Sequence, residues 1–203
     1  MTLIGVVGFI NSGKGTVGDI LAEHGFTKDS FAKPLKDSVA IVFGWSRDLL
    51  EGDTEHSRKW REQPDAFWSE KFERPFTPRE ALQLMGTEAG RDVFHNDIWV
   101  ISLLNRAKGK DVVVTDVRFK NEIEYIQKNG GIVIRVKRGD DPEWYDDIAS
   151  EKDDFFRNTY MAAFDVHRSE WDWVGCDVDH TITNDGTIDD LRQNINRVLH
   201  FIR

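Results

Sequence analysis

The stretch "GFINSGKGT" at residues 8–16 lies between a predicted strand and a predicted helix. The strand is the apolar run Leu3–Val7, whose β-branched residues are typical of a strand buried on both faces. The helix is expected to run from Lys14 to about Glu23, because its apolar residues recur at helical spacing. A glycine loop in this position can aim backbone N–H groups and the helix dipole at a phosphate.

The order of residues at the end of this loop differs from the common phosphate-loop pattern, G-x-x-x-x-G-K-[ST]. Gly15 follows Lys14, and the hydroxyl comes one place later, on Thr16. The alternative is a tight turn with an incidental lysine, but the strand–loop–helix context favours a phosphate site. The G-K-G-T ending resembles the loop of adenylate kinase and related nucleoside monophosphate kinases. A side chain at Gly15 is expected to intrude where the backbone packs closely.

The composition is that of an ordinary globular protein. The 203 residues are 39% apolar and 31% charged, and the net charge of −9 argues against a nucleic-acid backbone as the main partner. One cysteine, Cys176, excludes an intramolecular disulfide and a multi-cysteine metal site. The sequence has no apolar run near the roughly 20 residues of a membrane span and no signal-peptide layout. These features predict a cytoplasmic protein without a membrane partner.

Strands and helices are expected to alternate along the rest of the chain. This alternation predicts an α/β fold with a mostly parallel sheet and helices on both faces. We expect a single domain at 1–203, with an acceptor-binding excursion at about 46–76 and a lid-like excursion at about 138–173. The remaining predicted elements are helices at 34–44, 77 onward, 98–107, 122–128 and 188–202, and strands at 111–116, 132–136 and 176–183.

Asp116 ends the predicted strand "VVVTD", which resembles a Walker B strand. Its carboxylate is predicted to face the metal-bound phosphates, whereas the alternative is an aspartate that caps the next segment. Arg118 follows two residues later, where a guanidinium suits phosphate recognition, although a solvated surface role is the alternative. In parallel sheets ligands bind beyond the carboxyl ends of the strands, so Asp116 and the glycine loop are expected at one edge.

Other polar residues carry weaker signals. Basic residues in the first excursion and around it, Arg61 among them, usually form a solvated face. Arg138 opens the second excursion, where kinases commonly keep an arginine-bearing lid. The "DVDH" run at 177–180 suggests a metal site only loosely, because alternation on an edge strand explains it better. Cys176 is expected to be a small core residue rather than a nucleophile.

Taken in order, these motifs resemble the deoxynucleoside monophosphate kinases of T-even bacteriophages and their phage relatives. The resemblance includes the loop, "FAKPLKDSVA" at 31–40, "REALQLMGTEAGRDVFHNDIWV" at 79–100 and "VVVTDVRFKNEIEYIQKNGGIVIRVKR" at 112–138. It extends to "HRSEW" at 167–171 and "TITNDGTIDDL" at 181–191. It implies a P-loop kinase fold, ATP as co-substrate, Mg²⁺, small nucleotide substrates and a homodimer, although no surface stripe in the sequence establishes a dimer.

The motifs and the resemblance together predict roles for particular residues. The catalytic set comprises Lys14, Asp116, Arg118 and Arg138, with Asp116 holding the metal through water. The predicted ATP-binding residues are Asn11, Ser12, Gly13, Lys14, Gly15, Thr16, Asn184, Asp185 and Gly186. The predicted acceptor-binding residues are Lys36, Arg58, Arg79, Thr87, Trp99, Arg118 and Glu122.

The sequence therefore predicts a phosphotransferase that moves the γ-phosphoryl of ATP to deoxynucleoside 5′-monophosphates. Two alternatives stay open at this point. One is a P-loop kinase for another small acceptor, such as dephospho-coenzyme A, and the other is a nucleotide-hydrolysing switch or assembly NTPase. The two charged excursions favour an acceptor pocket over a switch.

Overall fold

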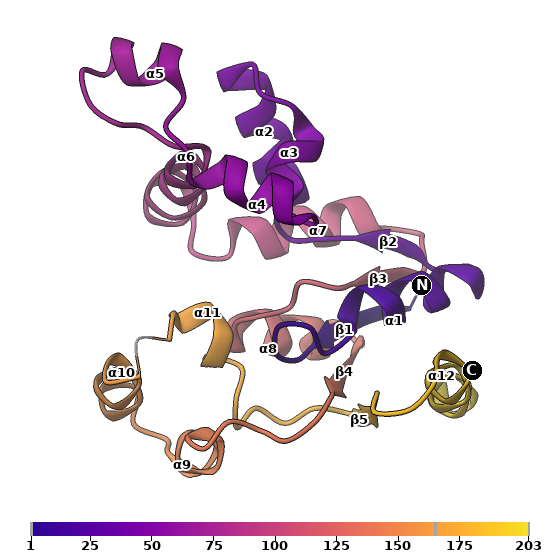
Figure 1. Cartoon of the computed structure of the whole chain (residues 1–203). Coiled ribbons are helices and arrows are strands. Elements are labelled where there is room, and N and C mark those ends of the chain that lie inside the picture. The colour runs from indigo at the N-terminus through magenta and orange to yellow at the C-terminus, as the bar shows by residue number, and fades with distance from the viewer. Residues whose placement is uncertain (1, 165, 203) are drawn as a thin grey trace. The chain divides into compact units, whose positions relative to one another are not determined.

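The computed structural model describes residues 2–164 and 166–202. The chain divides into two compact units (Figure 1). The first, which we call the sheet unit, comprises Met1–Ser30 and Ala107–Arg203, and the second, the helical unit, comprises Phe31–Arg106. The predicted excursion at 46–76 lies in the helical unit, and the one at 138–173 lies in the sheet unit.

The sheet unit is built on a five-stranded sheet in which every pairing is parallel. Its strands are β1 (Leu3–Val7), β2 (Thr27–Asp29), β3 (Val112–Val114), β4 (Ile132–Lys137) and β5 (His180–Thr183). Their order is β2-β3-β1-β4-β5, and the central strand β1 pairs Ile4 with Val113 on one side and with Ile132 on the other. The carboxyl ends of the strands therefore meet at one edge, as expected for a mononucleotide-binding sheet.

Helices cover both faces of this sheet (Figure 1). On one face, α1 (Lys14–Glu23) and α12 (Ile188–Ile202) bury Leu21 and Ile195 against Val6 of β1. On the other face lies α8 (Lys120–Lys128), which packs so closely that a Cβ on Gly5 would come within 2.6 Å of the Ile126 side chain. Three further helices follow β4: α9 (Tyr145–Ser150), α10 (Asp154–Ala162) and α11 (Arg168–Trp171).

The helical unit has its own core. Its elements are α2 (Lys33–Phe43), α3 (Arg47–Glu51), α4 (Glu55–Glu62), α5 (Ala66–Lys71), α6 (Pro78–Leu84), a π-helical segment η1 (Met85–Phe94) and α7 (Ile98–Ala107). Val39, Leu50 and Phe76 are buried at its centre, and the rings of Phe43 and Trp45 stack against each other at 4.6 Å. Trp60 and Trp68 of the polar 46–76 stretch pack against the same core, so this stretch is an ordered region.

Most predicted elements are present, and the differences are local. The last strand begins at His180, so residues 176–179 lie outside it, and Ile188, the first residue of α12, is exposed. The Thr77 side chain caps α6 by accepting the Glu80 N–H, and the Glu80 carboxylate forms an ion pair with Arg74. Strand β2 was not predicted. Within the described residues no helix has the length and apolar character that crossing a membrane requires.

Candidate active site

The glycine loop has a backbone that only glycine suits at two positions. Gly8 and Gly13 have φ values of 152° and 103°, in the region that L side chains rarely adopt. A Cβ on Gly8 would lie 2.4 Å from the Val136 carbonyl oxygen, and one on Gly13 would lie 2.3 Å from the Asn184 side-chain nitrogen. The loop therefore holds its shape by close contacts with the end of β4 and with the turn after β5.

The start of α1 has the features of an anion site. Gly13 is its N-cap, so no side chain caps it, and the first turn holds no acidic residue. The hydroxyl of Ser12 is buried without a hydrogen-bond partner in the part of the chain that the structure describes. Uncapped N–H groups carry the positive end of the helix dipole, and an unpaired buried hydroxyl costs about 1–3 kcal/mol. Both observations fit a loop that binds a phosphate.

Lys14 is held over the loop by the backbone. Its ammonium donates hydrogen bonds to the carbonyl oxygens of Gly8 and Phe9, both at 2.7 Å. The Lys14 pKa is lowered to about 8, chiefly by burial and then by the positive charge of Arg118, whereas the carboxylate of Glu170 acts in the opposite direction. An anionic ligand would remove this penalty by supplying the missing negative charge.

The lowered Lys14 pKa predicts that ATP affinity falls at alkaline pH. Lys14 loses its proton as the pH rises through about 8, whereas in the unfolded chain a lysine keeps its proton up to its ordinary pKa of 10.5. ATP should therefore bind up to about tenfold more weakly one unit above the folded pKa than near pH 7. Over the same window the unfolded chain binds more protons, so the free energy of unfolding should gain a contribution that rises with pH.

Calorimetric titration of ATP between about pH 7 and 9 tests this prediction, with Lys14→Met as the control. The variant should bind weakly at every pH. An equal decline of affinity in the wild type and the variant would assign the titration to another group.

The structure corrects the reason given for Gly15. Apart from its chain neighbours and the nearby backbone of α1, no described heavy atom lies within 4 Å of the place where a Cβ on Gly15 would stand, so there is room for a side chain there. Gly15 is also an exposed residue of α1. Crowding by the protein is therefore not what favours glycine at this position.

Gly15→Ser should fold at least as well as the wild type and should not raise kcat. Serine is a better helix former than glycine, by roughly 0.5 kcal/mol, and Thr16 already supplies a hydroxyl in the first turn. The melting temperature and steady-state kinetics check both parts. A higher kcat in the serine variant would mean that the chain lacks a hydroxyl which the common loop pattern provides.

Asp116 lies two residues beyond β3, near α1. The preceding residue, Thr115, packs so closely on α1 that a Cβ on Gly18 would lie 2.4 Å from its methyl group. Among the described residues no three His, Cys, Asp or Glu side chains are grouped as a metal site. Mg²⁺ prefers few carboxylate ligands, several waters and the phosphates of its substrate. Half-buried Asp116 and exposed Thr16 are residues of the type and place that such an ion would use.

Arg118 pairs with a residue that the sequence did not single out. Its guanidinium donates to the Glu170 carboxylate at 2.5 Å, although 52 residues separate them. Glu122 is buried and accepts the backbone N–H groups of Arg118 and Phe119 at 2.8 and 3.1 Å. Glu122 thus caps α8 and fixes the backbone that carries Arg118. Its predicted contact with the acceptor stays a prediction.

The turn Asn184–Gly186 lies against the glycine loop, although it is far away in sequence. The Asn184 side chain donates to the Ser12 carbonyl oxygen at 2.8 Å, and Asp185 accepts the Gly139 N–H at 2.6 Å. The structure therefore brings together the two groups of predicted ATP-binding residues. Arg138, beside Gly139, is exposed.

The predicted lid segment packs against the loop through aromatic rings. Phe9 of the loop lies 4.9 Å from Trp173 and 5.6 Å from Trp144, measured between ring centroids. Arg157 of α10 is buried and donates to backbone carbonyls at the end of the segment, among them that of Val174 at 2.8 Å. Arg157 thus has a structural role, and the lid function of residues 138–173 stays a prediction.

The predicted acceptor residues of the helical unit fall into two groups. Lys36 pairs with Glu51 at 2.7 Å, Arg79 pairs with Glu62, and Arg58 is exposed on α4. In the second group, the Trp99 indole donates to the Gly86 carbonyl at 2.8 Å, next to exposed Thr87. Each of these contacts therefore joins two residues of the helical unit.

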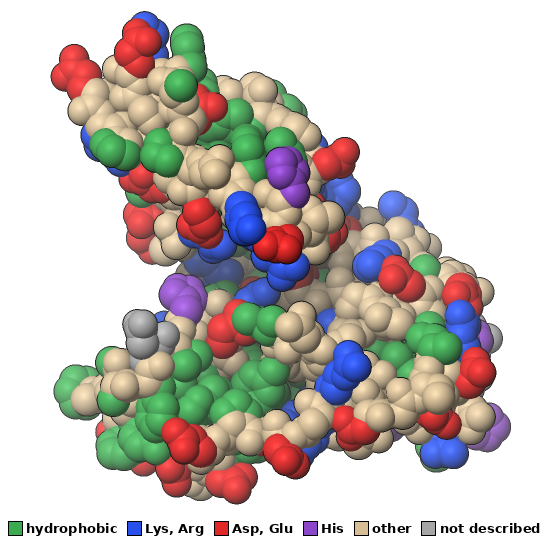
Figure 2. All heavy atoms as spheres, viewed as in Figure 1, with side chains coloured by type: hydrophobic (Ala, Val, Ile, Leu, Met, Phe, Trp, Pro, Cys, Tyr) green, Lys and Arg blue, Asp and Glu red, His purple; other side chains and the backbone are tan. Residues whose placement is uncertain are grey.

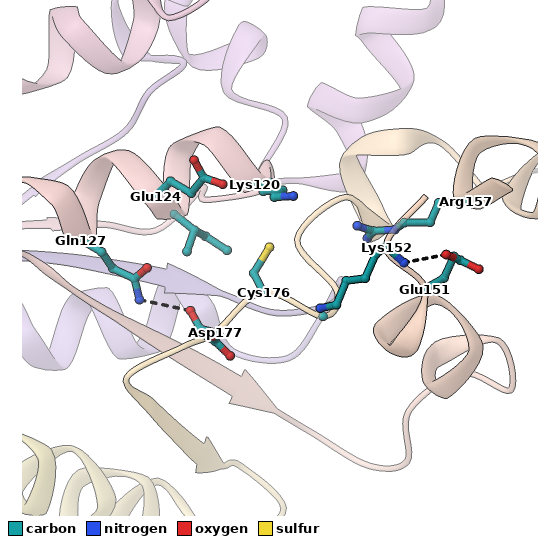
Figure 3. Close-up of a pocket in the computed structure, with 10 residues that line it drawn as sticks. Lys120, Glu124, Gln127, Glu151, Lys152, Arg157, Cys176 and Asp177 are labelled. Atoms are coloured by element: carbon teal, nitrogen blue, oxygen red, sulfur yellow. Dashed lines mark hydrogen bonds between the residues drawn. The ribbon is translucent and has the colours of Figure 1, made fainter. Parts of the chain in front are cut away.

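The sheet unit holds a pocket of about 240 Å³ (Figure 3). It is lined by α8, by residues 151, 152 and 157, and by residues 175–177, and none of the predicted site residues belongs to its lining. Cys176 is half-buried there, and burial raises the pKa of its thiol, which disfavours the nucleophilic thiolate.

The parallel sheet, the G-K-G-T loop and the carboxylate beyond β3 define a P-loop kinase. Over 153 residues the chain is 33% identical to the "Putative deoxynucleotide monophosphate kinase" of Acanthamoeba polyphaga mimivirus, covering 68% of this chain and 75% of that one. It is 46% identical over 56 residues to the deoxynucleoside-5′-monophosphate kinase of Escherichia phage T5, which is 26% of this chain and 22% of that protein. No family model matches the sequence.

Two solved kinase structures align over almost the whole chain. Dephospho-CoA kinase from Campylobacter jejuni gives a TM-score of 0.46 at 18% identity, covering 98% of this chain and 96% of that one. Shikimate kinase from Aquifex aeolicus gives 0.46 at 14% identity, covering 99% and 96%. On the evidence of the mimivirus relative, the chain belongs to the deoxynucleotide monophosphate kinase family and is a phosphotransferase.

Proposed function

We propose that this enzyme transfers the γ-phosphoryl of ATP to 2′-deoxynucleoside 5′-monophosphates and so forms the diphosphates. An oxygen of the acceptor phosphate forms the new bond to the γ-phosphorus. The bond from that phosphorus to the bridging oxygen breaks, and ADP leaves with the electron pair. We further propose that the two units act as one kinase domain.

The observation that carries this proposal is the 33% identity over 153 residues to a protein named for the same reaction. The geometry of residues 8–16 supports the donor side, because it combines an uncapped helix start, an unpaired buried hydroxyl and a lysine. A switch NTPase would need only this donor side. The acceptor chemistry therefore separates the two functions.

On the donor side, Lys14 and the backbone N–H groups of the loop would hold the β- and γ-phosphates. The turn at Asn184–Gly186 would contact the adenine, because it is bonded to the loop at Ser12. Mg²⁺ would be held by Asp116 through water and would neutralise charge on the transferred group.

On the acceptor side, Arg118 would bind the monophosphate by its planar fork. The other residues proposed for acceptor binding belong to the helical unit: Lys36, Arg58, Arg79, Thr87 and Trp99. No strong general base is required, since a phosphate monoester is already anionic at neutral pH. Catalysis is then positioning and charge stabilisation, with Arg138 contributing from the predicted lid.

The partners of the enzyme follow from the same proposal. Its substrates are small nucleotides, and the net charge of −9 disfavours binding to a nucleic-acid backbone. A homodimer in the cytoplasm, that of the host if a phage encodes the chain, completes the proposal. Sedimentation of the purified protein tests the dimer.

A coupled assay with a panel of acceptors tests the function. We expect ADP release to depend on an added deoxynucleoside monophosphate, with slow release in its absence. Dephospho-coenzyme A serves as the unrelated acceptor. ADP release that no acceptor accelerates would support a hydrolase instead, and a response to dephospho-coenzyme A alone would move the chain to another kinase reaction.

A further inference from the structure

Arg61 on α4 is a half-buried arginine without a partner. Its Nε is buried and makes no hydrogen bond in the part of the chain described, and no ion pair joins its guanidinium to a described carboxylate. Buried guanidinium groups are normally paired, because burying an unpaired charge costs several kcal/mol. The unmet donors of Arg61 therefore call for an explanation.

The acidic residues around Arg61 are already used by other cations. Glu51 accepts from Lys36 at 2.7 Å and from Arg47 at 2.5 Å, one cation on each carboxylate oxygen. Glu62 pairs with Arg79. Both glutamates act electrostatically on Arg61, but neither is bonded to it.

Two further arginines act on Arg61 beside the two glutamates. Burial lowers the pKa of its guanidinium, and the positive charges of Arg79 and Arg58 lower it further. Both neighbours are predicted acceptor residues. Figure 2 shows Lys and Arg side chains gathered with Asp and Glu side chains over α4. An anion bound at this place would relieve the repulsion between three arginines.

The backbone at Gly52 is shaped around the Arg61 guanidinium. Gly52 ends α3 with φ of 76°, and a Cβ there would lie 2.2 Å from both Cζ and one terminal nitrogen of Arg61. The absence of a side chain thus gives the guanidinium its position against the backbone. Among the described residues, this position holds the guanidinium against the backbone without a hydrogen bond, and only Nε is buried, so the two terminal nitrogens are left to a ligand.

We propose that Arg61, seated on Gly52 and flanked by Arg58 and Arg79, binds the 5′-phosphate of the acceptor nucleotide. The assignment rests on the proposed function, which it deepens by adding a phosphate ligand on the helical unit. A phosphate fits because its oxygens can accept two parallel hydrogen bonds from the fork. The alternative is that the aliphatic stem of Arg61 only fills space in the unit.

Arg61→Gln is the variant that tests this assignment, with Lys59→Gln as the matched control. Lys59 lies on the same helix, is exposed and pairs with Glu55. Arg61→Gln should weaken binding of a deoxynucleoside monophosphate about 10- to 100-fold in calorimetry without ATP, while ATP binding should not change. Its melting temperature should equal or exceed that of the wild type, because removing an unpaired buried charge relieves strain. Lys59→Gln should match the wild type in acceptor binding, ATP binding and melting temperature.

Two further variants make the test independent of one substitution. Gly52→Ala should displace the guanidinium and weaken acceptor binding, and Arg61→Lys should restore only part of it because the fork is lost. Unchanged acceptor binding in Arg61→Gln, or a loss matched by a lower melting temperature, would leave Arg61 a packing residue. If Arg61→Gln weakened only ATP binding, Arg61 would belong to the donor site. If the wild type neither binds nor phosphorylates any deoxynucleoside monophosphate, the proposed function itself fails and this assignment with it.

Discussion

Lys14→Ala should lower phosphoryl transfer by about 10³-fold or more while leaving the protein folded. The residue lies where the loop enters α1, and its ammonium is already fixed by the carbonyls of Gly8 and Phe9. The transferred phosphoryl spreads negative charge over its oxygens in the transition state, and a fixed cation in a half-buried site stabilises that charge strongly. Alanine removes the cation and leaves no substitute.

The free energy of unfolding should change little in Lys14→Ala. The Lys14 pKa is lowered to about 8, which means that folding penalises the charged form. Removing the side chain therefore forfeits two hydrogen bonds but also ends that penalty. The control is Lys28→Ala, which deletes an exposed ion pair with Asp19 in the same unit.

Steady-state kinetics and thermal melting of both variants decide the matter. We expect near-normal kinetics for Lys28→Ala and a melting temperature within a few degrees of the wild type for both. Near-normal turnover in Lys14→Ala would remove the donor site from residues 8–16. A large drop in its melting temperature would instead make Lys14 a structural residue.

The order of most helices and strands could be predicted from the sequence, because the strongest signals are local. Leu3–Val7 and the three valines of β3 are continuous apolar runs, and α12 carries its buried apolar residues at helical spacing. The loop at 8–16 could likewise be placed, since its glycines must precede a helix. Strand β2 escaped prediction because Thr27–Asp29 is three residues long and polar.

The parts that could not be predicted depend on contacts between distant residues. Arg118 and Glu170 are 52 positions apart, and "HRSEW" gave a motif without saying which side chain meets which. Arg61 was one cation among several in a polar stretch. Its lack of a partner follows from how Glu51 and Glu62 are used, which periodicity does not reveal. The open space at Gly15 is likewise a property of the packed structure.

Arg118→Ala should reduce kcat/KM for the acceptor by about a hundredfold or more, because it removes charge-assisted hydrogen bonds worth roughly 1.5–3 kcal/mol each. Arg118 lies beyond β3, two residues after Asp116, and its side chain is 42% exposed even while it pairs with Glu170. An exposed pair of this kind holds the fork in place at little cost, so an incoming phosphate can replace the Glu170 carboxylate.

Arg118→Ala should not weaken ATP binding, because of the charges around Lys14. Arg118 lowers the pKa of Lys14 and Glu170 raises it. Removing Arg118 therefore raises the Lys14 pKa and leaves more of the ammonium charged near pH 8. ATP affinity measured by calorimetry without acceptor should stay constant or improve slightly in Arg118→Ala.

Glu170→Gln supplies the matched control for this last prediction. It keeps the size of the side chain but weakens its hold on Arg118, so the KM for the acceptor should stay the same or fall. If Glu170→Gln instead raised this KM as strongly as Arg118→Ala, the pair would be needed intact for acceptor binding. If ATP binding collapsed in Arg118→Ala while the KM for the monophosphate held, Arg118 would belong to the donor site. A selective loss on the acceptor side, with ATP binding retained, is the pattern that only a phosphate contact from Arg118 explains.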